Sequence, residues 1–260
     1  MAIFRKYRIF SMLILIALIV VSSVVLANKW KSDSKYDKIT VKGNVSVSRE
    51  EILDIARLKD SLAFNDEINL KIIQDRILRH PEIKKAFVSK QPPDELVIEV
   101  IEKRPIAIVS FDNEVKLIDE ELELFTYKNI KKIFDLPVIS GLKLTPAESQ
   151  SERLKSDEIR TALFIIMNTY KKNKLLYNNI SEINFANPDA VTVYTNDVPF
   201  PCYLPRETGL SIANKDYQKI LLNRLVYLNN YLTQIYPDNK SKKINYLDLR
   251  YSNQIVVNYQ

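Results

Sequence analysis

The sequence predicts an α+β protein in which an N-terminal hydrophobic segment precedes two folded domains of unequal size. The first observation is a globular composition: 46% of the 260 residues are hydrophobic and 27% are charged, which excludes wholesale disorder and collagen. The second is that short strand-like runs alternate with helix-periodic runs from residue 38 to the end. We expect the helices to cover one face of a mostly antiparallel sheet, which is an α+β arrangement.

The rare residue types exclude several kinds of site. Three glycines, far apart in the chain, cannot form the Gly-rich loops that bind nucleotides. One cysteine, Cys202, excludes an intrachain disulfide and a Cys-rich zinc site, and one histidine, His80, argues against a His-based metal site. We therefore expect no cofactor and no bound metal.

The net charge of +6 is concentrated at the N-terminus. Residues 1–38 contain seven Lys or Arg and two Asp, so five of the six net positive charges lie there, on both sides of one hydrophobic segment. This placement indicates a membrane surface rather than nucleic acid, and the near-neutral remainder gives no reason to expect nucleic-acid binding.

That hydrophobic segment, residues 9–27, is predicted to be a transmembrane signal anchor. Its 19 uncharged residues match the thickness of the hydrocarbon core at the helical rise of about 1.5 Å per residue. Residues 1–8 would then be a cytoplasmic tail and residues 28–37 a linker. The alternative is a cleaved signal peptide ending at Val25–Ala27, although signal peptides have apolar cores of only about 7–15 residues. Flanking charge does not decide the orientation, and a long C-terminal domain permits the N-in, C-out arrangement.

Residues 38–108 are predicted to form a β-α-α-β-β domain. Ser48 and Glu51 make a capping box for the first helix, and Asn69 can cap the second, which ends before Pro81. The last strand alternates, so that Leu96, Ile98 and Val100 share one face.

Residues 109–260 are predicted to form a larger, mostly antiparallel sheet covered by helices. Helical periodicity indicates helices over residues 156–173 and 213–232. The expected strands are residues 116–119, 124–127, 180–185, 190–195, 198–204, 244–250 and 255–259.

No residue pattern commits the chain to catalysis. His80 precedes a proline at a helix end, and Cys202 has no second cysteine or histidine near it, so we interpret both as structural. The acidic cluster at residues 119–123 could supply a glycosidase-like pair of carboxylates, but a charged hairpin tip facing water explains it more simply.

The apolar, β-rich stretch from Ile244 to Tyr259 raises a different possibility. A strand that ends a chain can leave a sheet edge of unpaired amides and carbonyls, to which a partner can add a strand. A masked, purely structural edge fits the pattern equally well.

Three segments resemble the FtsQ/DivIB family of bacterial cell-division proteins. Residues 39–53 and 80–109 resemble its POTRA domain, through Gly43-Asn44, the turn at Pro93–Leu96 and the exit Arg104-Pro105. The run Tyr246–Tyr251 (YLDLRY) resembles the family's C-terminal motif. One departure is Leu122, at a position where the family usually has glycine.

The resemblance implies a non-enzymatic scaffold of the division machinery. Such a protein crosses the inner membrane once, with its N-terminus in the cytoplasm and its C-terminus in the periplasm, and concentrates at the septum. The implied partners are FtsB and FtsL, with FtsK and the septal peptidoglycan synthase complex as further partners. The alternatives are a POTRA-containing periplasmic chaperone for outer-membrane proteins and a secreted cell-wall hydrolase.

The resemblance also implies two contact sites. At the first, FtsB is captured by strand addition at the C-terminal β edge, by Arg250 and Tyr251 of the motif and by Asn253, Ile255, Val257 and Tyr259 after it. At the second, the edge of the POTRA sheet contacts upstream proteins of the division machinery through Phe87, Ser89, Lys90, Leu96 and Ile98.

Overall fold

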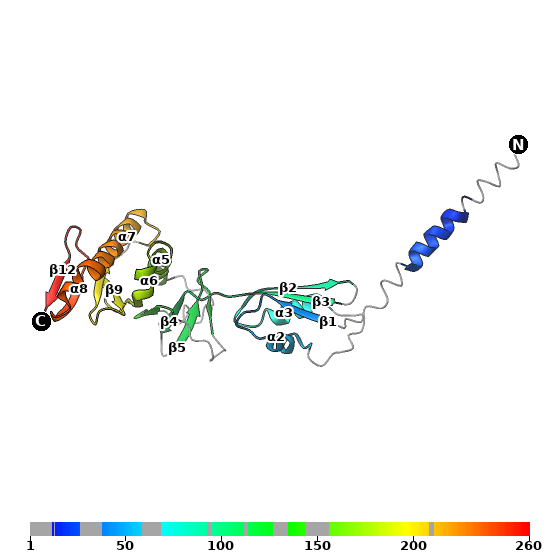
Figure 1. Ribbon diagram of the computed structural model, residues 1–260, viewed down its shortest axis with the longest axis horizontal. Helices are drawn as coiled ribbons and strands as arrows, with labels where there is room; N and C mark the ends of the chain where they lie inside the picture. The colour runs from blue at the N-terminus through cyan, green and yellow to red at the C-terminus, as the bar shows by residue number, and fades with distance from the viewer. Residues whose placement is uncertain are drawn as a thin grey trace, which may run out of the picture. The chain divides into compact units, whose positions relative to one another are not determined.

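A computed structural model describes residues 12, 14–26, 38–58, 69–92, 95–111, 114–126, 135–143, 156–207 and 211–260 (Figure 1). Residues 14–26 are helical, but within the described residues no helix has both the length and the apolarity needed to cross a bilayer. The expected span over residues 9–27 is therefore not confirmed; several of its residues, together with the expected tail and linker, lie outside the described part. The chain divides into two compact units, Met1–Glu102 and Lys103–Gln260.

The first unit is a three-stranded sheet with two helices, in the predicted β-α-α-β-β order. Its strand order is β1-β3-β2, with β1 parallel and β2 antiparallel to the central strand β3. Leu96, Ile98 and Val100 belong to one core cluster with residues of both helices, as the alternation predicted. The elements are β1 (Lys38–Lys42), α2 (Arg49–Ala56), α3 (Leu70–Ile77), β2 (Ile83–Gln91) and β3 (Glu95–Glu102).

Local side-chain contacts explain where the first unit's helices begin. The Ser48 side chain accepts the Glu51 amide, and that of Asn69 accepts the amides of Lys71 and Ile72, which satisfies N–H groups that have no partner within the helix. Before α2 the chain turns at Gly43, where φ is +82° and an added Cβ would lie 2.2 Å from the Val100 carbonyl oxygen. Only glycine fits this turn without a backbone shift.

The second unit is a nine-stranded sheet with the order β12-β11-β10-β9-β8-β7-β4-β5-β6. The pairs β4·β7, β7·β8 and β10·β11 are parallel and the other five are antiparallel, so the sheet is mostly antiparallel, as predicted. Its strands are β4 (Ala107–Phe111), β5 (Glu114–Ile118), β6 (Leu124–Phe125), β7 (Val138–Ser140), β8 (Ile180–Asn184), β9 (Ala190–Thr195), β10 (Cys202–Pro205), β11 (Ile244–Asp248) and β12 (Val256–Tyr259).

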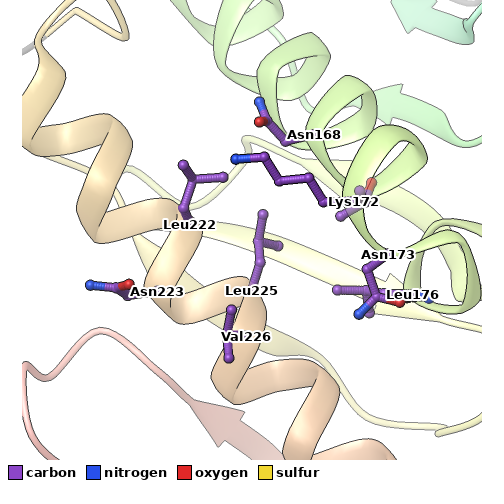
Figure 2. Close-up of a pocket in the computed structure, with 9 residues that line it drawn as sticks. Asn168, Lys172, Asn173, Leu176, Leu222, Asn223, Leu225 and Val226 are labelled. Atoms are coloured by element: carbon purple, nitrogen blue, oxygen red, sulfur yellow. Dashed lines mark hydrogen bonds between the residues drawn. The ribbon is translucent and has the colours of Figure 1, made fainter.

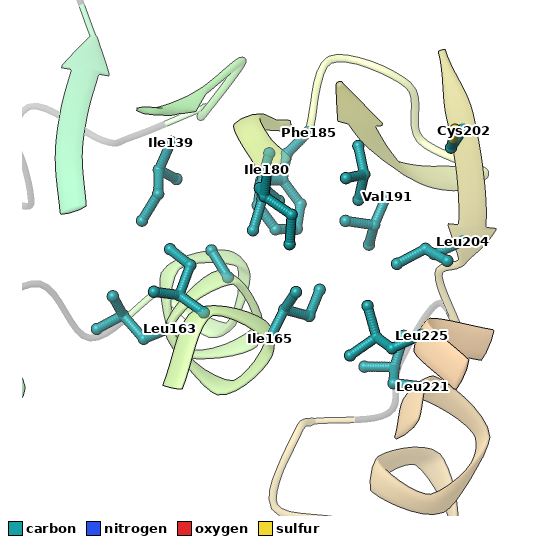
Figure 3. Close-up of a cluster of buried hydrophobic side chains, with 14 of the residues drawn as sticks. Ile139, Leu163, Ile165, Ile180, Phe185, Val191, Cys202, Leu204, Leu221 and Leu225 are labelled. Atoms are coloured by element: carbon teal, nitrogen blue, oxygen red, sulfur yellow. The ribbon is translucent and has the colours of Figure 1, made fainter. Parts of the chain in front are cut away.

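Two long helices pack their apolar stripes against the second sheet. They are α5 (Asp157–Lys172) and α7 (Lys215–Asn230); the short α6 (Lys174–Asn179) follows α5, and the π-helix η1 (Tyr231–Ile235) and α8 (Tyr236–Asn239) follow α7. Figure 3 shows their buried residues facing the strands: Leu163 lies on the side of Ile139, and Leu221 and Leu225 lie near Leu204. This core extends to the C-terminal end of the sheet, where it includes Leu247 and Leu249.

Several details differ from the prediction, and one of them is that β7 (Val138–Ser140) was not among the predicted strands. The strand β4 was not predicted, and its residues Ala107 and Ile108 pair with β5 and β7 of the second unit, although the prediction assigned them to the first domain. The strand expected over residues 198–204 begins only at Cys202, because Pro199 and Pro201 have no N–H to donate to a ladder.

Candidate partner-binding edge

The strand β12 lies at one end of the second sheet. Among the described strands it pairs only with β11, in an antiparallel register that joins Asp248 with Val256 and Leu247 with Val257. Its other side has no neighbouring strand within the described residues. An edge of this kind presents backbone N–H and C=O groups to which another extended segment can hydrogen-bond.

An ion pair between Asp248 and Arg250 lies where the chain leaves β11. The Arg250 side chain donates to both Asp248 carboxylate oxygens, through Nε at 3.0 and 3.2 Å and through Nη2 at 2.7 Å. The Arg250 backbone N–H donates to Oδ1 at 3.0 Å. Burial alone would raise the pKa of Asp248, but these hydrogen bonds outweigh it and hold that pKa below its usual value. The pair therefore fixes the turn that leads into β12.

Two tyrosine rings, those of Tyr203 and Tyr246, lie near Arg250. Its guanidinium carbon lies 5.8 Å from the centre of the Tyr203 ring on β10, and the centres of the Tyr203 and Tyr246 rings are 5.4 Å apart. Tyr251, next to Arg250, is 49% exposed. Arg and Tyr side chains at such a surface are the types that contribute most to protein–protein binding.

The remaining predicted residues of this edge divide between two environments. Asn253 and Tyr259 are exposed, and the Lys242 ammonium lies 5.4 Å from the centre of the Tyr259 ring. Ile255 and Val257 are half-buried and pack against the core of the second unit. The side chains of Ile255 and Val257 therefore hold β12 on the sheet, and a contact there would involve their backbone groups.

The sequence analysis gave no contact role to Tyr203, to Tyr246 or to the buried Asp248, although the last two belong to the motif at residues 246–251. The spacing of Asp248 and Arg250 could have indicated their pairing. Nothing local could have indicated Tyr203, because it reaches Arg250 only through the parallel pairing of β10 with β11.

The predicted edge of the first unit is partly wrong. Phe87, Ser89 and Lys90 lie on β2, an outer strand, and are exposed. Leu96 and Ile98 lie on β3, which is central because β1 pairs with it in parallel, and both side chains are 0% exposed. These two residues cannot form an edge contact.

The surroundings of His80 and Cys202, which were considered for catalysis, indicate structural roles. His80 is buried, its Nδ1 accepts the Glu82 N–H at 3.2 Å, and its Nε2 lies 3.2 Å from Glu51 Oε1, so an Nε2-protonated ring fits both contacts. Burial raises the pKa of the Cys202 thiol to about 12, which keeps it protonated at neutral pH. Within the described residues, no group of three or more His, Cys, Asp or Glu could hold a metal ion.

The acidic cluster at residues 119–123 is only partly a water-facing hairpin tip. Glu120 and Glu121 are exposed, but Asp119 is 2% exposed and its Oδ1 accepts the N–H groups of Glu121 and Glu123 at 2.9 and 3.0 Å. It thereby holds a turn in which Leu122 has a φ of +67°, a conformation that favours glycine. The prediction that the whole cluster faces water was wrong for Asp119.

Comparison with known proteins gives matches in both units. Two family models match: "POTRA domain, FtsQ-type" over residues 34–103 and "Cell division protein FtsQ/DivIB, C-terminal" over residues 107–250. The cell division protein FtsQ of Syntrophotalea carbinolica is 27% identical over 227 residues, covering 86% of this chain and 73% of that protein. FtsQ of Koribacter versatilis is 24% identical, covering 94% and 69%, and DivIB of Staphylococcus aureus is 26% identical, covering 62% and 36%. The chain belongs to the FtsQ/DivIB family of cell-division proteins.

Proposed function

We propose that this protein is a non-enzymatic scaffold of the division machinery that binds a partner segment by strand addition at β12. The observation that carries the proposal is the position of β12, which pairs only with β11 among the described strands and contains no charged residue. Hydrogen bonds along that backbone supply affinity, and the neighbouring Arg250 and Tyr251 supply selectivity.

FtsB is the proposed occupant of the edge, and FtsL, FtsK and the septal peptidoglycan synthase complex are the further proposed partners. The names of the relatives support a role in cell division. The 19 uncharged residues of segment 9–27, with bases on both sides, support an anchor in the inner membrane. The two folded units would then lie in the periplasm, and the protein would concentrate at the septum.

The scaffold works by positioning. An anchored chain meets an anchored partner within the plane of one membrane, which raises the effective concentration of the partner segment near β12. No covalent bond is made or broken in this activity, so it needs no catalytic role for His80 or Cys202.

The test is the substitution Tyr251→Ala in the full chain, with FtsB binding measured by titration. Truncation of an exposed aromatic residue at the contact weakens binding by about 2 kcal/mol. Tyr170→Ala is the matched control, because Tyr170 is an exposed tyrosine of the same unit, on α5, and is 56% exposed. Equal affinity of both variants and the wild type for FtsB would refute the proposed site at Tyr251.

A fluorescent fusion tests the cellular role. Enrichment at mid-cell, with filamentation when the protein is depleted, is expected of a division scaffold. A uniform envelope signal would favour a periplasmic chaperone instead.

A further inference from the structure

The helical layer of the second unit contains a groove that the strand-addition proposal does not use. It lies between α5 and α7, with a cavity volume of about 160 Å³. Figure 2 shows its walls: Asn168 and Lys172 on α5, Leu222 and Val226 on α7, and Leu176 of α6 at one end. All of these residues belong to one unit, so the groove exists regardless of how the two units are arranged.

The floor of the groove is apolar and incompletely covered. Leu176 and Leu225 are buried, Leu222 is half-buried, and Val226 is 55% exposed. A cavity of about 150 Å³ lined by aliphatic side chains is large enough to hold a benzene ring. The groove therefore has room for one aromatic side chain, and its burial there would remove apolar surface from water on both sides.

Among the described residues that line the groove, one carries a positive charge and none carries a negative charge. Lys172 is the one charged residue of the lining, and no ion pair to it is found within the described residues. Figure 2 shows its side chain extended from α5 into the space between the helices. The neighbouring amides are engaged locally: Asn168 donates to the Phe164 carbonyl at 2.8 Å, and Asn173 Oδ1 accepts the Leu176 amide at 3.0 Å.

We infer that this groove is a second docking site, which binds a partner segment carrying an aromatic side chain and a carboxylate about one helical turn away. The ring occupies the apolar floor, and the carboxylate pairs with Lys172. A helical segment can carry both groups on one face, because it places side chains three and four residues apart with Cβ atoms about 5–6 Å apart. This inference does not depend on β12.

The test uses two synthetic helical peptides as probes and the full chain in lipid nanodiscs. Each peptide has about 15 residues, enough for a marginal helix, and one central Phe. One peptide carries Glu three and four residues after the Phe, and the other carries Lys there. Binding is followed by methyl NMR, because Leu176, Leu222, Leu225 and Val226 all carry methyl groups that line the groove.

The acidic peptide is expected to shift these methyl signals and the basic peptide to shift them much less. Lys172→Glu is expected to weaken binding of the acidic peptide about fivefold and to strengthen binding of the basic one. Val226→Arg places a charged side chain over the floor of the groove and should abolish binding of the acidic peptide. Val115→Arg is the matched control, because Val115 is an exposed valine of the same unit on β5, 65% exposed and outside the groove.

Three results would overturn the inference. Equal shifts with both peptides would show that Lys172 does not select a carboxylate. Shifts confined to other methyl groups would show that the peptides do not bind in the groove. Methyl shifts that depend on protein concentration without any peptide would identify a second copy of the chain as the occupant. Tyr251→Ala should leave the peptide titration unchanged, which separates this site from the β12 edge.

Discussion

The edge strands β2 and β12 belong to different sheets and differ in their chemistry. β2 (Ile83–Gln91) carries three lysines, Lys84, Lys85 and Lys90, whereas β12 (Val256–Tyr259) carries no charged residue. Lysines on an edge oppose pairing with another strand, because pairing would crowd and desolvate their charges. Of these two outer strands, only β2 therefore carries charges that oppose strand addition.

In each unit a carboxylate at the end of an inner strand orders a neighbouring segment of the chain. In the first, Glu102 at the end of β3 accepts the backbone N–H groups of Val45, Ser46 and Val47 at 2.7–3.0 Å. In the second, Asp248 at the end of β11 binds the Arg250 side chain and N–H. The first arrangement only orders a loop, whereas the second also presents a cation and its neighbour Tyr251 beside the open edge.

The largest expected effect comes from Arg250→Ala. The substitution leaves Asp248, 3% exposed, as a buried charge without its partner, so the free energy of unfolding should fall by about 2 kcal/mol. FtsB binding should also weaken, because the turn into β12 loses its support. Thermal unfolding and a binding titration of the same preparation measure both. Unchanged stability would show that the ion pair does not hold the turn.

A pair of lysines in β12 tests the contrast between the two edges directly. Val256→Lys combined with Asn258→Lys gives β12 the character of β2, and FtsB binding should weaken at least about tenfold, or 1.4 kcal/mol. Ser89→Lys is the matched control, since it adds a lysine to the exposed side of β2 and should leave FtsB affinity unchanged. If the two variants lose affinity equally, the distinction between the edges is wrong.

Glu102→Gln should have a smaller effect that is restricted to the first unit. Burial alone would raise the pKa of Glu102, but the three N–H donors outweigh it and hold that pKa below its usual value. The folded state therefore binds protons less readily than the unfolded chain. The stabilisation is complete above pH 4.5 and is lost as the pH falls toward the lower, folded-state pKa.

The free energy of unfolding should fall by about 1 kcal/mol in Glu102→Gln at neutral pH. As the pH falls through the usual pKa of a glutamate toward the lower pKa of folded Glu102, the stability of the wild type should decline more steeply than that of the variant. Parallel pH profiles of the two proteins would show that the carboxylate charge contributes nothing. FtsB binding should not change.

Much of the fold could be predicted because its signals are local. Ser48 and Asn69 cap the helices at the predicted positions, and the alternation at Leu96 and Ile98 gave the buried face of β3. The position of β3 within its sheet could not be predicted, because the parallel pairing of Lys38 with Glu95 joins residues far apart in the chain. The edge prediction for Leu96 and Ile98 failed for this reason.

The candidate site shows the same division between local and distant signals. The motif containing Arg250 and Tyr251 could be located from the sequence, and so could the strand that follows it. Tyr246 belongs to that motif, but its contact with Tyr203 forms only when β10 and β11 pair, so no local pattern indicated the contact. Asp119 was interpreted as a surface carboxylate because its N–H donors come from a turn that residue types alone did not specify.

Hydrogen exchange of the full chain, with and without an FtsB segment, tests the central claim most directly. Added strands protect the backbone amides to which they bond, so the amides of β12 should exchange more slowly in the complex while those of β2 keep their free-state rates. If β12 exchanges at the same rate in both states while FtsB is bound, the partner binds elsewhere and β12 is not the docking edge.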